Sequence, residues 1–253
     1  MEMVKLSIDG KEITAEKGST ILEAARQYNI EIPTLCYHEA VKPFGACRLC
    51  VVEIKKGKKS RIVTSCNYFV EDGLEVLTNT ERVLRVRRLV IELLLARCPN
   101  VKIVRELAEK LGVEDTTFTL DNSFCILCGL CVRVCDEVVG AKAISFANRG
   151  IYREVTSPFL EPAEDCIGCG SCVYVCPTGL VTMKDVMGAR FYTPDGDYEL
   201  GNLRIMHNWK QSLRLAECKK CGRPFMPQAQ IDFIAKKTGI SPDELKICPT
   251  CKE

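Results

Sequence analysis

Histidine and tryptophan are scarce in this 253-residue chain, which has two histidines and one tryptophan. His38 and His207 are far apart in the sequence, so no constellation of histidine with a nucleophile or a carboxylate can be argued from it. The chain also lacks a G-x-G-x-x-G motif, a P-loop and any candidate flavin motif. A catalytic enzyme acting alone is therefore the least favoured function, and hydride exchange with NAD(P)H would need a flavin-bearing partner.

Charge excess and long hydrophobic runs are also missing. The 35 basic and 33 acidic residues nearly balance, which gives no electrostatic footprint for nucleic acid. The longest apolar run, residues 89–96, is interrupted by Glu92 and is too short to span a bilayer. The first ten residues lack the apolar stretch of a signal peptide. We therefore expect a protein of the reducing cytoplasm with no membrane span.

Cysteine, in contrast, is abundant, with 17 residues, and paired spacings without a secretion signal favour metal over disulfides. The pattern C-x2-C-x2-C-x3-C occurs twice between residues 125 and 176. In bacterial ferredoxins this pattern holds two [4Fe–4S] clusters, and the fourth cysteine of each run binds the other cluster. We therefore assign Cys125, Cys128, Cys131 and Cys176 to a first cluster, and Cys135, Cys166, Cys169 and Cys172 to a second. Two zinc knuckles fit this triplet spacing poorly.

The N-terminal segment predicts a β-grasp sheet. Alternating strands are expected at residues 4–8 and 12–15, with a turn at Asp9-Gly10. A helix capped by Ser19 or Thr20 should follow, and two further strands are expected near residues 50–54 and 61–65.

Four further cysteines fall within this segment: Cys36, Cys47, Cys50 and Cys66. Four thiolates can hold a [2Fe–2S] cluster, although the first gap is longer than in the plant-type spacing. Zinc is the alternative. A Rieske site would need a second Cys/His pair beside Cys36-x-His38, so we interpret His38 as a loop or surface residue.

The C-terminal segment contains two C-x2-C pairs, formed by Cys218, Cys221, Cys248 and Cys251. This is the pattern of a zinc ribbon, and a domain this small needs a structural metal. A third [4Fe–4S] cluster is the alternative, since it would use the same four thiolates. Two helices are expected between the pairs, the second opening at Ser241-Pro242. Only Cys98 is left without a cluster or metal assignment, and we interpret it as a core thiol at a helix end.

Two connecting segments carry fewer signals. A helix is expected from residue 80 to Pro99, because apolar residues recur at positions 83, 86, 90, 93 and 94, and a second helix is expected at residues 103–111. The arginines of the first helix either form a solvated face or dock an acidic partner; they are Arg82, Arg85, Arg87 and Arg88. Further on, a hairpin is expected around the turn at residues 194–197, and Trp209 should pack on the core or on a partner.

These motifs resemble a known family. Residues 33–98, with Pro33-Thr-Leu-Cys36 and Gly45-Ala-Cys47-Arg-Leu-Cys50, and the dicluster run continuing to Asp136, are similar to the N-terminal region of the large iron–sulfur subunit of NADH:quinone oxidoreductase. The same region occurs in [FeFe] hydrogenases and NAD-linked formate dehydrogenases. The resemblance covers residues 1–185, about three quarters of the chain. The family usually has a His-plus-three-Cys cluster between the two modules, and residues 92–107 lack that motif, so we expect this cluster to be absent.

The sequence thus predicts an α+β chain of five parts. They are a [2Fe–2S] β-grasp domain (1–79), a helical linker (80–118), a 2[4Fe–4S] ferredoxin domain (119–185), a hairpin and helical connector (186–217) and a zinc-ribbon-like domain (218–253). The resemblance implies an electron-transfer subunit of a cytoplasmic oxidoreductase complex. Its expected partners are a flavoprotein that oxidises NAD(P)H, a hydrogenase or a formate or aldehyde dehydrogenase, and a ferredoxin. A free-standing carrier and a redox-sensing regulator are the alternatives.

Overall fold

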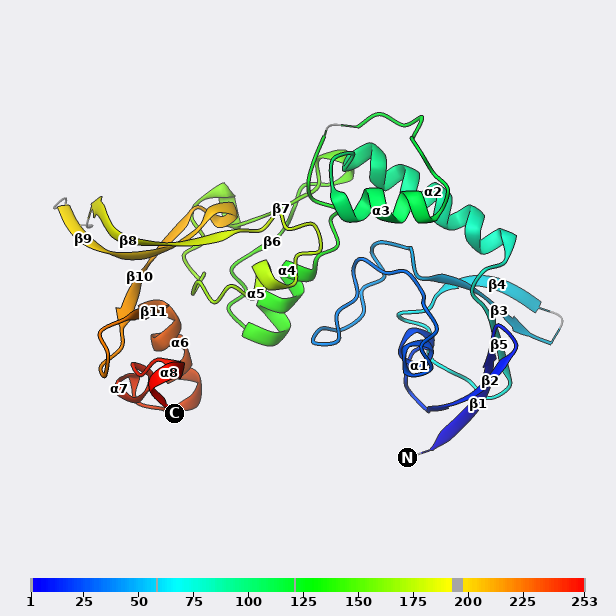
Figure 1. Ribbon diagram of the computed structural model, residues 1–253, viewed down its shortest axis with the longest axis horizontal. Coiled ribbons are helices and arrows are strands. Elements are labelled where there is room, and N and C mark those ends of the chain that lie inside the picture. The colour runs from blue at the N-terminus through cyan, green and yellow to red at the C-terminus, as the bar shows by residue number, and fades with distance from the viewer. Residues whose placement is uncertain (1, 58, 121, 193–197, 253) are drawn as a thin grey trace. The chain divides into compact units, whose positions relative to one another are not determined.

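The computed structural model describes residues 2–57, 59–120, 122–192 and 198–252. The chain forms two compact units, Met1–Leu130 and Cys131–Glu253, which are described separately (Figure 1). Among the described residues, no helix combines the length and the apolar character needed to cross a bilayer.

The first unit is built on a five-stranded mixed sheet of order β2-β1-β5-β3-β4. Its strands are β1 (Met3–Ile8), β2 (Lys11–Glu16), β3 (Val51–Lys56), β4 (Lys59–Thr64) and β5 (Leu74–Leu77). The predicted hairpin is confirmed, because β1 and β2 pair antiparallel across Asp9-Gly10, where both residues have positive φ. Strand β5 was not predicted from the sequence. It lies between β1 and β3, and it pairs parallel with β1 and antiparallel with β3.

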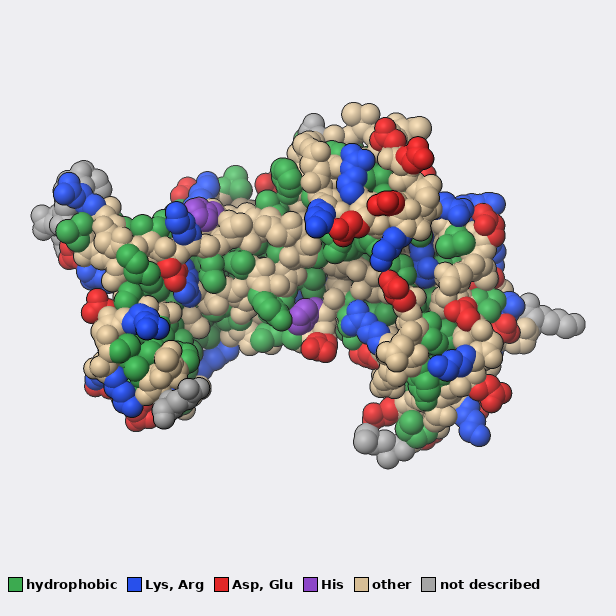
Figure 2. Space-filling model, viewed as in Figure 1, with side chains coloured by type: hydrophobic (Ala, Val, Ile, Leu, Met, Phe, Trp, Pro, Cys, Tyr) green, Lys and Arg blue, Asp and Glu red, His purple; other side chains and the backbone are tan. Residues whose placement is uncertain are grey.

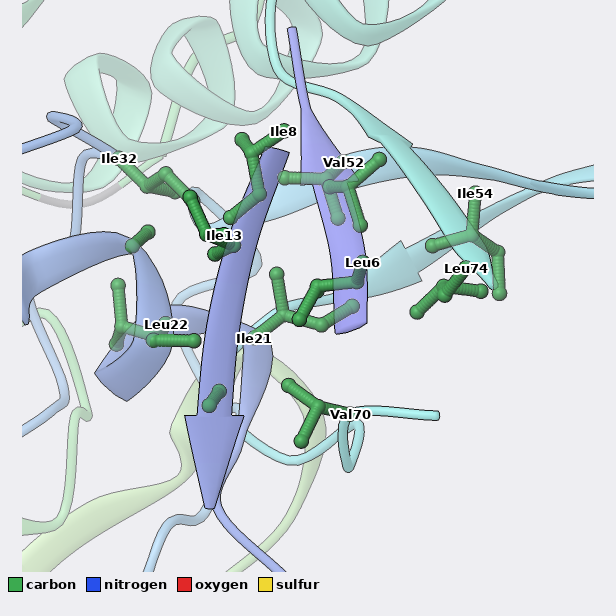
Figure 3. Close-up of a cluster of buried hydrophobic side chains, with 14 of the residues drawn as sticks. Leu6, Ile8, Ile13, Ile21, Leu22, Ile32, Val52, Ile54, Val70 and Leu74 are labelled. Atoms are coloured by element: carbon green, nitrogen blue, oxygen red, sulfur yellow. The ribbon is translucent and has the colours of Figure 1, made fainter. Parts of the chain in front are cut away.

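Helix α1 (Ile21–Gln27) supplies the apolar layer against this sheet. The predicted cap is Thr20, which forms a capping box with Glu23. The α1 side chains Ile21 and Leu22 are fully buried and lie in one cluster with strand residues such as Ile8 and Val52, as Figure 3 shows. The sheet and α1 therefore bury one core, which includes Cys50 and Cys66.

Helices α2 (Glu81–Arg97) and α3 (Lys102–Lys110) complete the first unit. The buried stripe of α2 is formed by Val83, Arg87, Ile91, Leu95 and Ala96. Of the apolar positions that indicated this helix, Val83 is buried but Leu93 is 45% exposed. The buried residues follow an i, i+4 spacing from Val83 to Leu95, and this spacing places Arg87 within the buried stripe.

The second unit contains the rest of the cysteine-rich repeat and the C-terminal segment. Short helices α4 (Leu130–Arg133) and α5 (Ser171–Tyr174) each follow a cysteine loop, and a π-helical turn, η1 (Val134–Val139), continues from α4. Two short strands, β6 (Ser145–Ala147) and β7 (Glu154–Thr156), pair between the two runs of cysteines; 3₁₀ turns lie at Gly150–Tyr152 (η2) and Pro158–Leu160 (η3).

A four-stranded sheet of order β11-β10-β9-β8 follows. Strands β8 (Met183–Tyr192) and β9 (Tyr198–Met206) form the predicted hairpin, whose expected turn at 194–197 lies outside the described residues. A 3₁₀ turn, η4 (His207–Trp209), leads to β10 (Gln211–Glu217). The C-terminal segment adds β11 (Pro224–Pro227), α6 (Gln228–Thr238), α7 (Pro242–Leu245) and α8 (Pro249–Lys252). Ser241 caps α7 by accepting a hydrogen bond from the backbone of Asp243.

Candidate metal and iron–sulfur sites

The first candidate site lies at the end of the five-stranded sheet where β3 begins and β4 ends. Cys36 lies in the loop after α1, Cys47 and Cys50 directly precede β3, and Cys66 directly follows β4. All four are buried, with at most 6% of each residue exposed. The backbone N–H of Ser65 donates to the carbonyl of Cys50, which ties the loops before β3 and after β4 together. Local strand pairing therefore brings the last two cysteines to one place.

The four sulfurs form two hydrogen-bonded pairs. The hydrogen bond with Cys36 lowers the pKa of the Cys47 thiol to about 6, and the hydrogen bond with Cys66 lowers the pKa of the Cys50 thiol to about 7. The same two bonds raise the pKa of Cys36 and of Cys66 above the ordinary range. Two pairs of buried thiols fit a [2Fe–2S] group, which has two irons and four cysteine ligands.

Backbone N–H groups also point at these sulfurs. The N–H of Cys47 donates to Sγ of Cys36 at 3.4 Å, and the N–H of Leu35 donates to Sγ of Cys47 at 3.5 Å. Gly45 has φ +69°, and a Cβ added there would lie 3.2 Å from the side-chain nitrogen of Asn67. Glycine at position 45 therefore allows the loop to turn closely over Asn67. The N–H of Cys47, in the same loop, faces the sulfur of Cys36.

Arg87 supports this loop from outside the cysteine motif. Its side chain is buried, and it donates from Nε to the carbonyl of Leu49 (3.1 Å) and from Nη2 to the carbonyl of Val51 (2.7 Å). Burial lowers the pKa of this guanidinium, and charge at Cys50 opposes that shift. Both functions that we considered for Arg87, a solvated face and partner docking, are therefore wrong. The i, i+4 spacing of Arg87 from Val83 and Ile91 was the sequence signal that could have predicted its burial.

The two cysteine repeats have the same local backbone. In the first, Leu127 (φ +54°) and Gly129 (φ +69°) flank Cys128. In the second, Gly168 (φ +66°) and Gly170 (φ +79°) hold the equivalent places. In the second loop the backbone of Gly168 forms a hydrogen bond with the thiol of Cys166, as left-handed turns of this kind allow. The sequence repeat is therefore also a repeat of loop conformation.

The cysteines that we assigned to the second cluster line one cavity. Cys135, Cys166, Cys169 and Cys172 line one partly open cavity, together with apolar residues that include Met206 and Trp209. Burial raises the pKa of the Cys135 thiol, while hydrogen bonds from the backbone of Ala143 and its neighbours oppose this rise. A mostly apolar cavity lined by four thiols fits an iron–sulfur group better than an ordinary core, which would be filled by side chains.

The first-cluster cysteines are divided between the two units, and their grouping stays a prediction: they are Cys125, Cys128, Cys131 and Cys176. Within the first unit, Arg97 donates from Nε to the carbonyl of Cys125 at 3.0 Å. Burial raises the pKa of the Cys176 thiol, but hydrogen bonds from Thr178 and nearby backbone groups outweigh it, and the pKa is lowered.

Cys98, the unassigned cysteine, is the C-terminal cap residue of α2 and is fully buried. Burial raises the pKa of its thiol to about 11. This position at a helix end in the core is the one that we predicted.

The C-terminal cysteines form a compact set. The sulfurs of Cys218, Cys221, Cys248 and Cys251 lie within 4.8 Å of one another. The Sγ atoms of Cys221 and Cys248 are 3.8 Å apart, and the backbone N–H of Cys248 donates to Sγ of Cys218 at 3.3 Å. That backbone bond lowers the pKa of Cys218 to about 6. The set can hold a metal, and the two C-x2-C pairs predicted from the sequence are brought together here.

A buried cysteine set, a second set around a mostly apolar cavity and a compact third set define a multidomain iron–sulfur protein. Residues 1–81 match the family described as a 2Fe-2S iron-sulfur cluster binding domain. Residues 124–180 and residues 159–223 each match a 4Fe-4S dicluster domain. The chain belongs to the family of iron–sulfur subunits found in NADH-quinone oxidoreductases and related hydrogenases.

Three curated relatives show where the similarity lies. The chain is 37% identical over 207 residues to the NADPH-Fe(3+) oxidoreductase subunit alpha of Geobacter sulfurreducens, covering 72% of this chain and 24% of the relative. It is 36% identical over 211 residues to the NADP-reducing hydrogenase subunit HndD of Solidesulfovibrio fructosivorans, covering 71% and 36%. It is 33% identical over 204 residues to a subunit of the NADH-quinone oxidoreductase of Rhizobium meliloti, covering 70% and 24%. The chain thus spans between about a quarter and about a third of these relatives' lengths.

A solved structure is also similar. A chain of the NAD+-reducing [NiFe]-hydrogenase, in its H2-reduced state, matches with a TM-score of 0.55 and 32% identity. The match covers 61% of this chain and 75% of that chain.

Proposed function

We propose that this chain is the iron–sulfur electron-transfer subunit of a cytoplasmic, multi-subunit oxidoreductase. The observation that carries the proposal is the presence, on one chain, of a buried four-cysteine set at the end of the sheet and a second four-cysteine set around an apolar cavity. When bound, each cluster would carry one electron at a time.

The partners follow from the relatives' names. These relatives are subunits of NADPH-, NADP- and NADH-linked oxidoreductases and hydrogenases. Because this chain has no nucleotide- or flavin-binding motif, the partner that takes a hydride from NAD(P)H would be a flavoprotein subunit. A hydrogenase, a formate or aldehyde dehydrogenase, or a ferredoxin-linked enzyme would lie at the other end. Acidic and basic side chains are mixed over the face seen in Figure 2, which agrees with protein partners rather than nucleic acid.

The finer architecture is part of the same proposal. The five-stranded sheet with α1 packed on it supports a β-grasp domain. The C-terminal set supports a zinc ribbon, because a tetrahedral zinc with Zn–S bonds of about 2.3 Å places its thiolates about 3.8 Å apart. The Cys221–Cys248 distance is 3.8 Å. A [4Fe–4S] cube would hold the sulfurs farther apart, since irons and sulfides lie between them.

Native purification tests the proposal. The chain should co-purify under anaerobic conditions with a flavoprotein subunit and a catalytic subunit. Metal analysis should give about ten irons and one zinc per chain, for one [2Fe–2S], two [4Fe–4S] and the ribbon. About fourteen irons and no zinc would replace the ribbon with a further cluster. Recovery of the chain alone, with iron but without a partner, would contradict a subunit role.

A further inference from the structure

The connector that follows the cysteine repeats packs directly on the second cysteine loop. Arg204 in β9 donates from Nη1 to the carbonyl of Gly168 at 3.1 Å. Asp185 in β8 holds the same guanidinium through two bonds of 2.7 and 2.9 Å. A Cβ added to Gly168 would lie 2.5 Å from Cδ1 of Leu213 in β10. The connector is therefore fitted against the Cys166–Cys169 loop.

Trp209 extends this contact to a sulfur atom. Its side chain is buried, with 4% of the residue exposed, and its Nε1 donates to Sγ of Cys172 at 3.4 Å. Its carbonyl accepts from the backbone N–H of Ala163 at 3.2 Å, so the residue is fixed at both ends. An indole N–H is a donor only, and when buried it usually has a partner. Here that partner is a sulfur we assign to the second cluster.

We propose that Trp209 is a positioning residue that raises the reduction potential of the second [4Fe–4S] cluster. The inference rests on the proposed function, because it takes Cys172 as a ligand of that cluster. A hydrogen bond to a ligand sulfur stabilises negative charge, and one-electron reduction adds negative charge to the cluster. The indole N–H therefore favours the reduced state. Met206, which lines the same cavity, supplies apolar cover without a donor.

A redox titration of the full chain, purified anaerobically and reduced stepwise by dithionite, tests this. In Trp209→Phe, an aromatic ring is retained and the N–H is lost. The potential of one [4Fe–4S] centre, followed by electron paramagnetic resonance, should shift to more negative values. The other [4Fe–4S] centre, the [2Fe–2S] centre and the iron content should stay as in the wild type. His207→Gln is the matched control, because His207 lies in the same turn but is exposed and does not line the cavity, and it should leave all three potentials in place.

The single tryptophan of the chain allows a second substitution. Growth with 3-benzothienylalanine replaces Trp209 alone with a ring of nearly the same shape that has no N–H. If Trp209→Phe loses iron, the same redox titration of the chain that carries 3-benzothienylalanine tests the role of the N–H instead. Unchanged potentials with either replacement, in a chain that still holds two [4Fe–4S] centres, would overturn the inference and leave the proposed function standing. A wild-type chain without two [4Fe–4S] centres would instead overturn the cluster assignment.

Discussion

The Arg87→Met substitution removes a buried cation beside the candidate [2Fe–2S] cysteines while keeping a long side chain. Arg87 makes two hydrogen bonds to carbonyls of the loop that carries Cys47 and Cys50. No carboxylate of the described residues lies within salt-bridge distance of it. A guanidinium stays charged even when buried, so its charge needs compensation. We expect the negatively charged cluster to supply that compensation.

The magnitude follows from these contacts. A hydrogen bond to a charged group stabilises the fold by about 1.5–3 kcal/mol, so the two bonds contribute roughly 3–6 kcal/mol before desolvation. Burying the guanidinium costs several kcal/mol, which offsets most of that gain in the cluster-free chain. With the cluster bound, removing the cation also leaves a buried negative group without its partner, at a cost of about 3–5 kcal/mol. The substitution should therefore destabilise the loaded chain more than the cluster-free chain.

The assay is denaturant unfolding of both forms under anaerobic conditions, with the [2Fe–2S] absorption as a second readout. Arg85→Met is the matched control, because Arg85 is exposed on the same helix and should change either form by less than about 0.5 kcal/mol. An equal loss of stability in the two forms of Arg87→Met would refute charge compensation by the cluster. A loss no larger than that of Arg85→Met would refute the structural role of the two hydrogen bonds.

Three other substitutions have defined outcomes. Cys98→Ala should leave the iron content unchanged and lower stability by about 1 kcal/mol, because the thiol is buried in the core; a loss of iron would contradict this. Hydrogen bonds from Ser60 and Thr80 and the charge of Arg82 lower the pKa of Glu53, so its contribution is present above the ordinary value of about 4.5 and is lost as pH falls through the lowered native value. Glu53→Gln should remove that acid limb from the pH profile of unfolding, and a profile parallel to the wild type would count against it. Cys221→Ser should remove about one zinc and no iron per chain, whereas a loss of about four irons would indicate a cluster.

The sequence predicted the features that depend on neighbours along the chain. The Asp9-Gly10 turn fixes the first hairpin, and the Thr20 cap fixes the start of α1, because both act over a few residues. The C-x2-C spacings were informative for the same reason, although the sets themselves are completed by cysteines farther along the chain. Each C-x2-C unit places its ligands through one local loop, such as the one around Gly168.

The features that depend on tertiary packing were not predictable in this way. Strand β5 is short and pairs with β1 and β3, so its place in the sheet depends on residues that are far away in the sequence. Arg87 is of a residue type usually found at the surface, and only the packing of α2 on β3 places it inside. Trp209 was expected to pack on the core or on a partner, but the sequence could not give Cys172 as the contact.

Arg87 and Trp209 lie in segments that the cysteine spacing leaves as connections between modules. Each directs N–H groups toward a ligand loop, Arg87 at two backbone carbonyls and Trp209 at a sulfur. Donors of this kind favour negative charge, and an iron–sulfur group with thiolate ligands is negative in both redox states. The spacing of the cysteines along the chain indicates which residues can bind iron, because iron binding requires only thiolates that can come close together. If the proposed clusters bind at these cysteines, the surroundings that set a potential include α2 and the turn after β9, and the connecting segments are then part of the sites they join.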